Sequence, residues 1–291
     1  MMRRAVLCTA MGLVASLLAI HPSAAATLPT VEPAMVTGCG AAIAKPGGGT
    51  WECTFADNFN GTSLDRTKWH PQTNFATGGP WPAQRSCHVD DPHNIAVAQG
   101  NLRLTVRRAS TLLTCQGLRA VFSSAQVSTY WKFSQRYGRF EARIKSHPTA
   151  GPIGGLQESF WLWPDDRYSR GWWPAAGEID IAELYSRYNT LVIPYLHYTW
   201  TDNGGPRPGI NTNYCPAKRG VFNTYTLTWS STTLKIDVNG TNCLTNTSGD
   251  PAFQKRYIIA LTQGLGVGAN RYHWNTPIPA TMEVDYVRVW S

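Results

Sequence analysis

The residues best suited to chemistry lie in the segment 177–183, Gly-Glu-Ile-Asp-Ile-Ala-Glu, which contains three carboxylates. Side chains in a β-strand alternate between two faces, so Glu178 and Asp180 share one face and the isoleucines share the other. Glu183 has the wrong parity for the first face. A β-bulge adds one residue to a strand, and a bulge near Ile181 returns Glu183 to the carboxylate face. The spacing therefore predicts three acids on one face of a sheet.

Three acids on one face suit more than one role. Retaining glycosidases use a nucleophile and a proton donor about 5–5.5 Å apart. A third acid can hydrogen-bond the nucleophile and hold the two pKa values apart. Hard cations such as calcium also bind grouped carboxylates, and a solvated strand face shows the same alternation. Clustered like charges cost stability, which favours a function for the group.

The first 26 residues predict a secretory signal. Arg3 and Arg4 precede an apolar run over residues 5–20, and small residues follow at 24–26. The run is too short for a comfortable membrane span, and no later segment approaches the roughly 20 apolar residues that a span needs. We therefore expect a secreted, extracellular protein without a membrane span.

Composition excludes some partners and allows one large domain. The formal net charge is +8, but the basic residues are scattered and do not interleave with aromatic residues, so we expect no nucleic acid as a partner. A mildly basic surface is compatible with an anionic cell wall. The residues after the signal suffice for one all-β domain with a sizeable core.

Six cysteines remain once Cys8 leaves with the signal. They contain no C-x-x-C pair, so we expect neither a zinc motif nor a redox motif. An even number in an exported protein favours disulfides, and six cysteines allow fifteen connectivities. We favour the sequential pairing, which is Cys39–Cys53, Cys87–Cys115 and Cys215–Cys243.

Short alternating segments recur from residue 51 to the end of the chain. They include 101–107, 139–145, 225–229, 234–238 and 283–290, and Asn239-Gly240 marks a hairpin turn. No long segment has a helical period, which predicts one all-β domain over 51–291, an antiparallel sandwich or barrel. Residues 27–50 lack strand periodicity and predict a loosely ordered leader tethered through Cys39.

Two neighbouring segments, residues 160–164 (Phe-Trp-Leu-Trp-Pro) and 171–183, resemble the active-site signature of glycoside hydrolase family 16. The form is the E-x-D-x-x-E variant, which looks like the laminarinase branch and carries a bulge. The segments 55–61, 137–143 and 284–289 are also similar to that family. The resemblance implies a concanavalin A-like β-jelly roll, a sandwich of two curved antiparallel sheets.

The resemblance also implies a role for each acid. Glu178 corresponds to the nucleophile, which forms a glycosyl-enzyme intermediate. Glu183 corresponds to the proton donor, which later activates water. Asp180 corresponds to the residue that orients Glu178. No cofactor is required for this chemistry.

Three further residues are expected to bind the substrate. Sugars pack their apolar C–H faces on indole rings, and Trp173 stands where the family has such a platform. Trp161 is a second candidate, with a core role as the alternative. His197 is similar to a histidine that the family often places near the acids, although a lone histidine on a strand is usually only a satisfied polar residue. Structural roles are expected for Trp163, Trp172 and Tyr185.

Asp285 resembles a position at which many family members bind a structural calcium, helped by backbone carbonyls near Ala56 and Gly100. An ordinary surface aspartate is the alternative.

The chain departs from the laminarinase branch at residues 157–159, where Gln-Glu-Ser replaces Trp-Pro-Ala. It also has Cys87 and His88 where the family often has Glu-x-x-Tyr-Tyr. Both departures weaken the assignment of glucan as the substrate.

The sequence thus indicates a secreted retaining endo-β-glycosidase acting on a β-linked polysaccharide, most simply an endo-1,3(4)-β-glucanase, working as a monomer. A galactan-directed hydrolase or a transglycosylase would use the same acids with different subsites. A lectin-like sugar-binding protein is the alternative of another class, since fold does not fix function. Three adjacent acids argue against the lectin, because binding alone does not need them.

Overall fold

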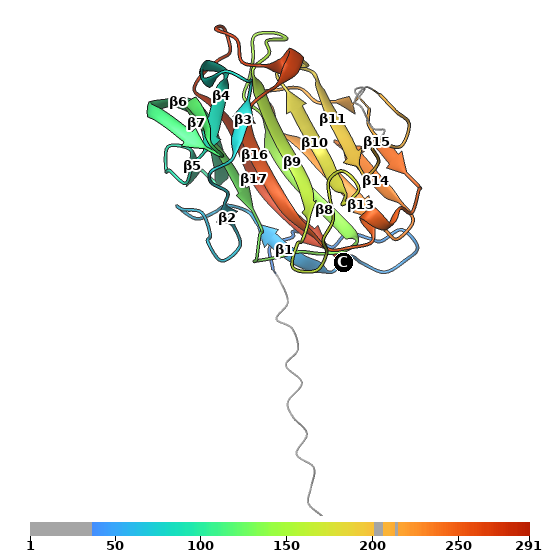
Figure 1. Ribbon diagram of the computed structural model, residues 1–291. Helices are drawn as coiled ribbons and strands as arrows, with labels where there is room; N and C mark the ends of the chain where they lie inside the picture. The colour runs from blue at the N-terminus through green and yellow to red at the C-terminus, as the bar shows by residue number, and fades with distance from the viewer. Residues whose placement is uncertain (1–36, 201–205, 213–214) are drawn as a thin grey trace, which may run out of the picture. The chain divides into compact units, whose positions relative to one another are not determined.

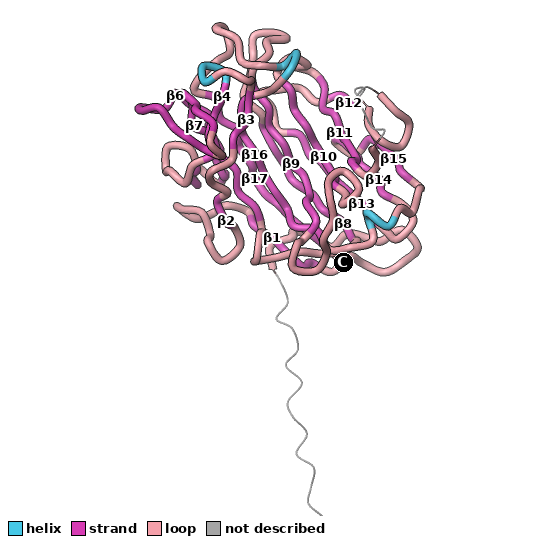
Figure 2. The backbone as a smooth tube through the Cα atoms, in the orientation of Figure 1, coloured by secondary structure: helices cyan, strands magenta, loops and turns pink. Residues whose placement is uncertain are grey.

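The computed structural model describes residues 37–200, 206–212 and 215–291, and its regular secondary structure is almost entirely β-strand, joined by many loops (Figure 2). The predicted signal and the first part of the predicted leader lie outside the described residues. Helix in the described chain is limited to three 3-10 turns, η1 (Pro82–Gln84), η2 (Pro251–Phe253) and η3 (Gly268–Asn270). No helix in these ranges is long and apolar enough to cross a bilayer. The all-β prediction is confirmed.

One sheet carries the three acids, and we call it the carboxylate sheet. Its neighbouring strands are antiparallel throughout. In order across the sheet they are β2 (His70–Pro71), β7 (Leu118–Ser128), β16 (Tyr257–Leu265), β9 (Leu156–Pro164), β10 (Glu178–Tyr185), β11 (Leu191–His197) and the short β12 (Cys215–Pro216).

A second sheet, the opposite sheet, packs behind the first (Figure 1). Its order is β5 (Ile95–Ala98), β6 (Asn101–Cys115), β17 (Ala280–Trp290), β8 (Gly138–Lys145), β13 (Asn223–Trp229), β14 (Leu234–Val238) and β15 (Thr241–Asn246), and β1 (Cys53–Asp57) pairs with the end of β17. The long β6–β7 hairpin joins the two sheets, because β6 pairs first with β17 and then with β7. Beside β7 lies β4 (Arg85–His88), which is parallel to it, and β3 (Ala76–Gly78) pairs with β4 in the antiparallel sense.

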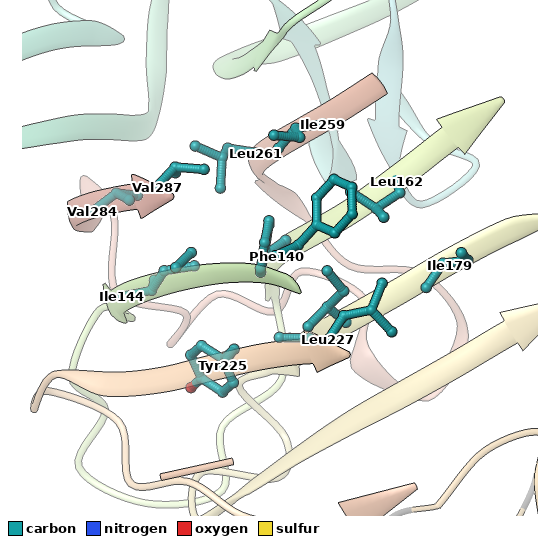
Figure 3. Packing of buried hydrophobic residues seen from close by; sticks show 14 of the residues in the cluster. Phe140, Ile144, Leu162, Ile179, Tyr225, Leu227, Ile259, Leu261, Val284 and Val287 are labelled. Atoms are coloured by element: carbon teal, nitrogen blue, oxygen red, sulfur yellow. The ribbon is translucent and has the colours of Figure 1, made fainter. Parts of the chain in front are cut away.

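The core lies between the two sheets and is made of the alternate side chains of each strand. Figure 3 shows Leu162 of β9 and Ile179 of β10 facing side chains of the opposite sheet such as Phe140 and Leu227, and all four are fully buried. Burying one large apolar side chain stabilises the fold by about 1.5–3 kcal/mol. This burial fixes the facing of β9 and β10, so their other side chains must point outward.

Three disulfides confirm the sequential pairing. Cys39–Cys53 holds the segment before β1 against the end of β17, where Cys39, Ala56 and Trp290 form a small buried cluster. Cys87–Cys115 joins β4 to β6, and Cys215–Cys243 joins β12 to β15. Such bridges persist in oxidising compartments.

Candidate active site

The three acids of β10 line one hollow on the outer face of the carboxylate sheet, which we call the acid hollow. Its volume is ≈ 170 Å³, and β9, β16, β7 and β3 supply the rest of its lining, including Trp161 and Thr262. Asp180 pairs with Trp161 across to β9, whereas the next paired residue, Ala182, faces Phe160. One residue of β10 is therefore extra at this point. Ile181 and Ala182 are both buried in the core, and Glu183 returns to the outer face as predicted.

A glycine directly precedes β10 for a steric reason. Gly177 has a left-handed φ of 90°, and a Cβ atom built on it would lie 2.1 Å from the hydroxyl of Tyr257. Only a residue without a Cβ tolerates both constraints. Gly177 therefore sets the path by which Glu178 enters the sheet.

Burial governs the titration of Glu178 and Asp180. It is the main cause that raises the pKa of Glu178 well above its usual range, and the charge of Asp180 adds to it. The Trp173 indole donates a hydrogen bond to Glu178 Oε2 at 2.6 Å, which lowers that pKa in part. Asp180 is only 4% exposed, and burial followed by the charge of Glu183 raises its pKa well above normal.

Glu183 is held by two hydrogen-bond donors that both bind its Oε1 atom. The Tyr185 hydroxyl donates at 2.6 Å and the Gln157 side-chain amide donates at 3.1 Å. Burial raises the pKa of Glu183, and these two bonds oppose the rise because they favour the charged carboxylate. Glu178 and Glu183 therefore share a hollow but have different partners, which is the condition for two carboxyls to take different roles.

Sequence reasoning missed both of these donors. The sequence predicts only a structural role for Tyr185 and marks Gln157 only as a departure from the laminarinase branch. Tyr185 has the same parity as Glu183, two residues before it, so the sequence alone could have placed both side chains on one face of the strand. Gln157 comes from β9 and pairs with Tyr185, so its contact depends on a register between strands that one strand cannot reveal. The neighbouring departure, Glu158, faces the interior and pairs with buried Arg219, so it does not line the hollow.

The predicted sugar-binding residues Trp173 and His197 lie beside the acids. Their ring centroids are 5.3 Å apart, and His197 stacks on Tyr195 at 4.0 Å. His197 Nε2 lies 3.3 Å from Asp180 Oδ2. Trp173 is 49% exposed, which leaves much of its ring accessible to a ligand.

A second hollow continues from the first, and we call it the aromatic hollow. It has a volume of ≈ 470 Å³ and shares Gln126 and Trp161 with the acid hollow. Trp163, Phe75 and Tyr130 also line it. Trp163, for which a structural role was expected, therefore faces the groove. Together the two hollows form a groove that runs from the acids along β9 towards β7 and β2.

Asp285 lies on β17 in the opposite sheet, away from the acids. Its Oδ2 atom forms an ion pair with Arg143 Nη1 at 2.5 Å. Among the described residues, no cluster of three histidine, cysteine, aspartate or glutamate side chains suits a metal ion. The guanidinium of Arg143 already supplies a positive charge that faces this carboxylate. Calcium at Asp285 stays a prediction.

Comparison with known proteins identifies a family and several relatives of this chain. Residues 84–288 match the profile of the family described as glycosyl hydrolases family 16. Glucan endo-1,3-beta-glucosidase A1 of Niallia circulans is 29% identical in an alignment of 260 residues, which covers 81% of this chain and 37% of that protein. Keratan-sulfate endo-1,4-beta-galactosidase of Sphingobacterium multivorum is 27% identical over 83% of this chain and 55% of that protein. The chain thus spans about a third to a half of these relatives.

A solved structure confirms the fold. The endo-beta-1,3-glucanase from Pyrococcus furiosus superimposes with a TM-score of 0.69 over 86% of this chain and 97% of its own, at 24% identity. The predicted β-jelly roll of two antiparallel sheets is therefore confirmed.

The raised pKa of Glu178 makes a prediction about stability. A carboxyl whose pKa is higher in the folded state than in the unfolded state costs stability as the pH rises through the interval between the two values. Glu178→Gln removes that cost, so Tm should rise by on the order of a few degrees at neutral pH. The gain should shrink below the ordinary glutamate pKa of about 4.3. Differential scanning calorimetry across pH measures it, with exposed Glu52→Gln as the control. A lower Tm at neutral pH would contradict the argument.

The Tyr185 contact predicts a shift in titration. Tyr185→Phe removes one donor to Glu183 and keeps the ring, so the pKa of Glu183 should rise. Carboxyl ¹³C NMR follows the change, and the Glu183→Gln spectrum assigns the resonance. Tyr188→Phe, at an exposed ring outside the acid hollow, is the matched control. An unchanged Glu183 titration in Tyr185→Phe would show that the hydroxyl does not hold the carboxylate.

Proposed function

Since the chain belongs to the glycosyl hydrolases of family 16, we propose that it is a secreted endo-β-glycosidase that cleaves a β-linked polysaccharide with retention of configuration, most simply a β-1,3(4)-glucan. The observation that carries this proposal is the pair of glutamates in one hollow with different hydrogen-bond partners. Three disulfides support an exported protein.

Each acid has a distinct task in the proposed reaction. Glu178 attacks the anomeric carbon, and the C–O bond to the leaving sugar breaks as Glu183 protonates the glycosidic oxygen. Glu183 then takes a proton from water, which attacks the glycosyl-enzyme and releases Glu178. The Trp173 hydrogen bond favours ionised Glu178, as a nucleophile requires. Both donors to Glu183 bind Oε1, which assigns the transferred proton to Oε2.

Asp180 and the aromatic residues complete the proposed site. The raised pKa of Asp180 favours its neutral form, which limits the repulsion among three close carboxyls. Trp173 and Trp161 offer ring faces for pyranose units near the cleavage point. His197 contacts both Asp180 and Trp173, so it positions them. No cofactor takes part.

The relatives and the groove together support the proposed sugar and a second candidate. The Niallia relative is named for glucan and the Sphingobacterium relative for keratan sulfate, which makes a galactan-directed hydrolase the second candidate. Gln157, which stands where the laminarinase branch has an aromatic residue, lines the acid hollow, and this departure weakens the assignment of glucan. A transglycosylase would use the same acids, and a lectin-like protein would bind sugar without cleaving it.

A substrate screen tests the proposed activity. We expect the protein to release reducing ends from β-1,3-glucan or mixed-linkage β-1,3-1,4-glucan, with β-galactan and keratan sulfate as comparison substrates. The Glu178→Ala variant should lose this activity by several orders of magnitude. Binding without release of reducing ends from any of these substrates would favour the lectin-like alternative.

Azide separates the tasks of the two glutamates. Glu183→Ala keeps the nucleophile, so an activated aryl β-glycoside should still form the glycosyl-enzyme, and azide should give the β-glycosyl azide after two inversions. In Glu178→Ala azide can only attack directly, which gives the α-azide. NMR of the anomeric proton distinguishes the products. Release of an α-configured product from a β-linked substrate by the unsubstituted protein would show inversion, and the role of Glu178 would be wrong.

A further inference from the structure

The groove continues beyond the aromatic hollow into a third hollow, which we call the distal hollow. Its volume is ≈ 530 Å³, and Trp131 and residues 166–170 line it. Asp166 lines both the aromatic and the distal hollow. The Tyr130 hydroxyl donates a hydrogen bond to Asp166 Oδ2 at 3.2 Å, and this bond holds the side chain that the two hollows share in place. A polysaccharide chain that follows the groove away from the acids therefore reaches Trp131.

Trp131 has an unusual backbone for an exposed aromatic residue. Its φ is +59°, and its side chain is 64% exposed. The left-handed conformation is unfavourable for a bulky residue, whereas glycine adopts it freely. An exposed indole gains little burial to offset that cost. Backbone strain of this kind concentrates at ligand-binding sites.

Neighbouring groups hold the Trp131 ring in a fixed orientation. The guanidinium of Arg167 lies 5.8 Å from the ring centroid, and the Tyr130 ring lies 6.1 Å away in an edge arrangement. Arg167 is itself fixed by two hydrogen bonds to the buried carboxylate of Asp165, at 2.9 and 2.6 Å. An indole that is fixed before the ligand arrives loses little freedom on binding.

The charges around the distal hollow favour a neutral ligand. Arg167 lies in the lining but is neutralised by Asp165. The remaining charged residues of the lining are Asp166 and Arg170, which have opposite signs. A carboxylate acceptor and a guanidinium donor suit sugar hydroxyls.

We propose that Trp131 forms a distal subsite that binds a neutral pyranose unit of the polysaccharide, several units from the cleavage point. The sugar stacks its C–H face on the indole, and Asp166 and Arg170 bond its hydroxyl groups. This inference rests on the proposed function, because the ligand is the far end of the same substrate.

The test uses a variant that should fold at least as well as the unsubstituted protein. Trp131→Gly removes the ring and relieves the left-handed backbone, so we expect no loss of Tm. KM and kcat are measured on β-1,3-linked gluco-oligosaccharides of increasing length. KM should be unchanged for short oligosaccharides that do not reach Trp131 and should rise about three- to tenfold for long ones, with kcat unchanged. Trp274→Ala, which removes an equally prominent indole outside the three hollows, should change neither.

Two results would overturn the subsite. One is an unchanged KM for long oligosaccharides in Trp131→Gly, and the other is an equal rise in KM at every length.

Failure of the proposed glucanase activity is distinguishable, because the unsubstituted protein itself would then release no reducing ends from glucan. Affinity electrophoresis on glucan, galactan and keratan sulfate replaces the kinetics in that case. Weaker retardation of Trp131→Gly supports the subsite. Equal retardation, or no retardation of the unsubstituted protein, overturns it.

Discussion

One extra residue in β10 is the constraint on which the site depends. Without it, the two-residue period of the strand would turn Glu183 into the core and Ala182 into the groove. Burying an unpaired carboxylate among apolar side chains costs several kcal/mol. The bulge avoids that cost because Ile181 and Ala182 both pack inward, and Glu183 regains a polar surrounding. The bulge thus determines both the core packing of Ile181 and Ala182 and the outward position of Glu183.

The hollow tolerates its acids because each has a partner of its own. Glu178 accepts from Trp173, Asp180 lies beside His197, and Glu183 accepts from Tyr185 and Gln157. These partners do not remove the burial cost, since all three pKa values remain raised. The well-packed core beneath β9 and β10 offsets it. Natural proteins tolerate such unfavourable groups, here three buried carboxyls close together, mainly at functional sites.

The alternation of residues was enough to predict an antiparallel all-β domain, the facing of the acids and the bulge, whereas the two-sheet jelly roll was predicted from the family resemblance. The alternation succeeded because period-two burial is local to one strand, as it is for Glu178 and Ile179. The residues that it missed depend on other information. Gln157 meets Glu183 only through the register of β9 with β10, and Trp131 stands out only through a backbone angle. The inward facing of Glu158 was readable, because Glu158 has the same parity in its strand as the core residues Phe160 and Leu162.

The place of β17 in the opposite sheet has a consequence for how the protein is made. This strand, residues 280–290, lies between β6 on one side and β8 on the other and also pairs with β1. The ribosome synthesises it after every other strand of the sheet. The central pairs of that sheet therefore cannot form during most of translation, and contacts so distant in sequence form slowly. The opposite sheet therefore closes only when this last strand docks between β6 and β8, which are synthesised long before it.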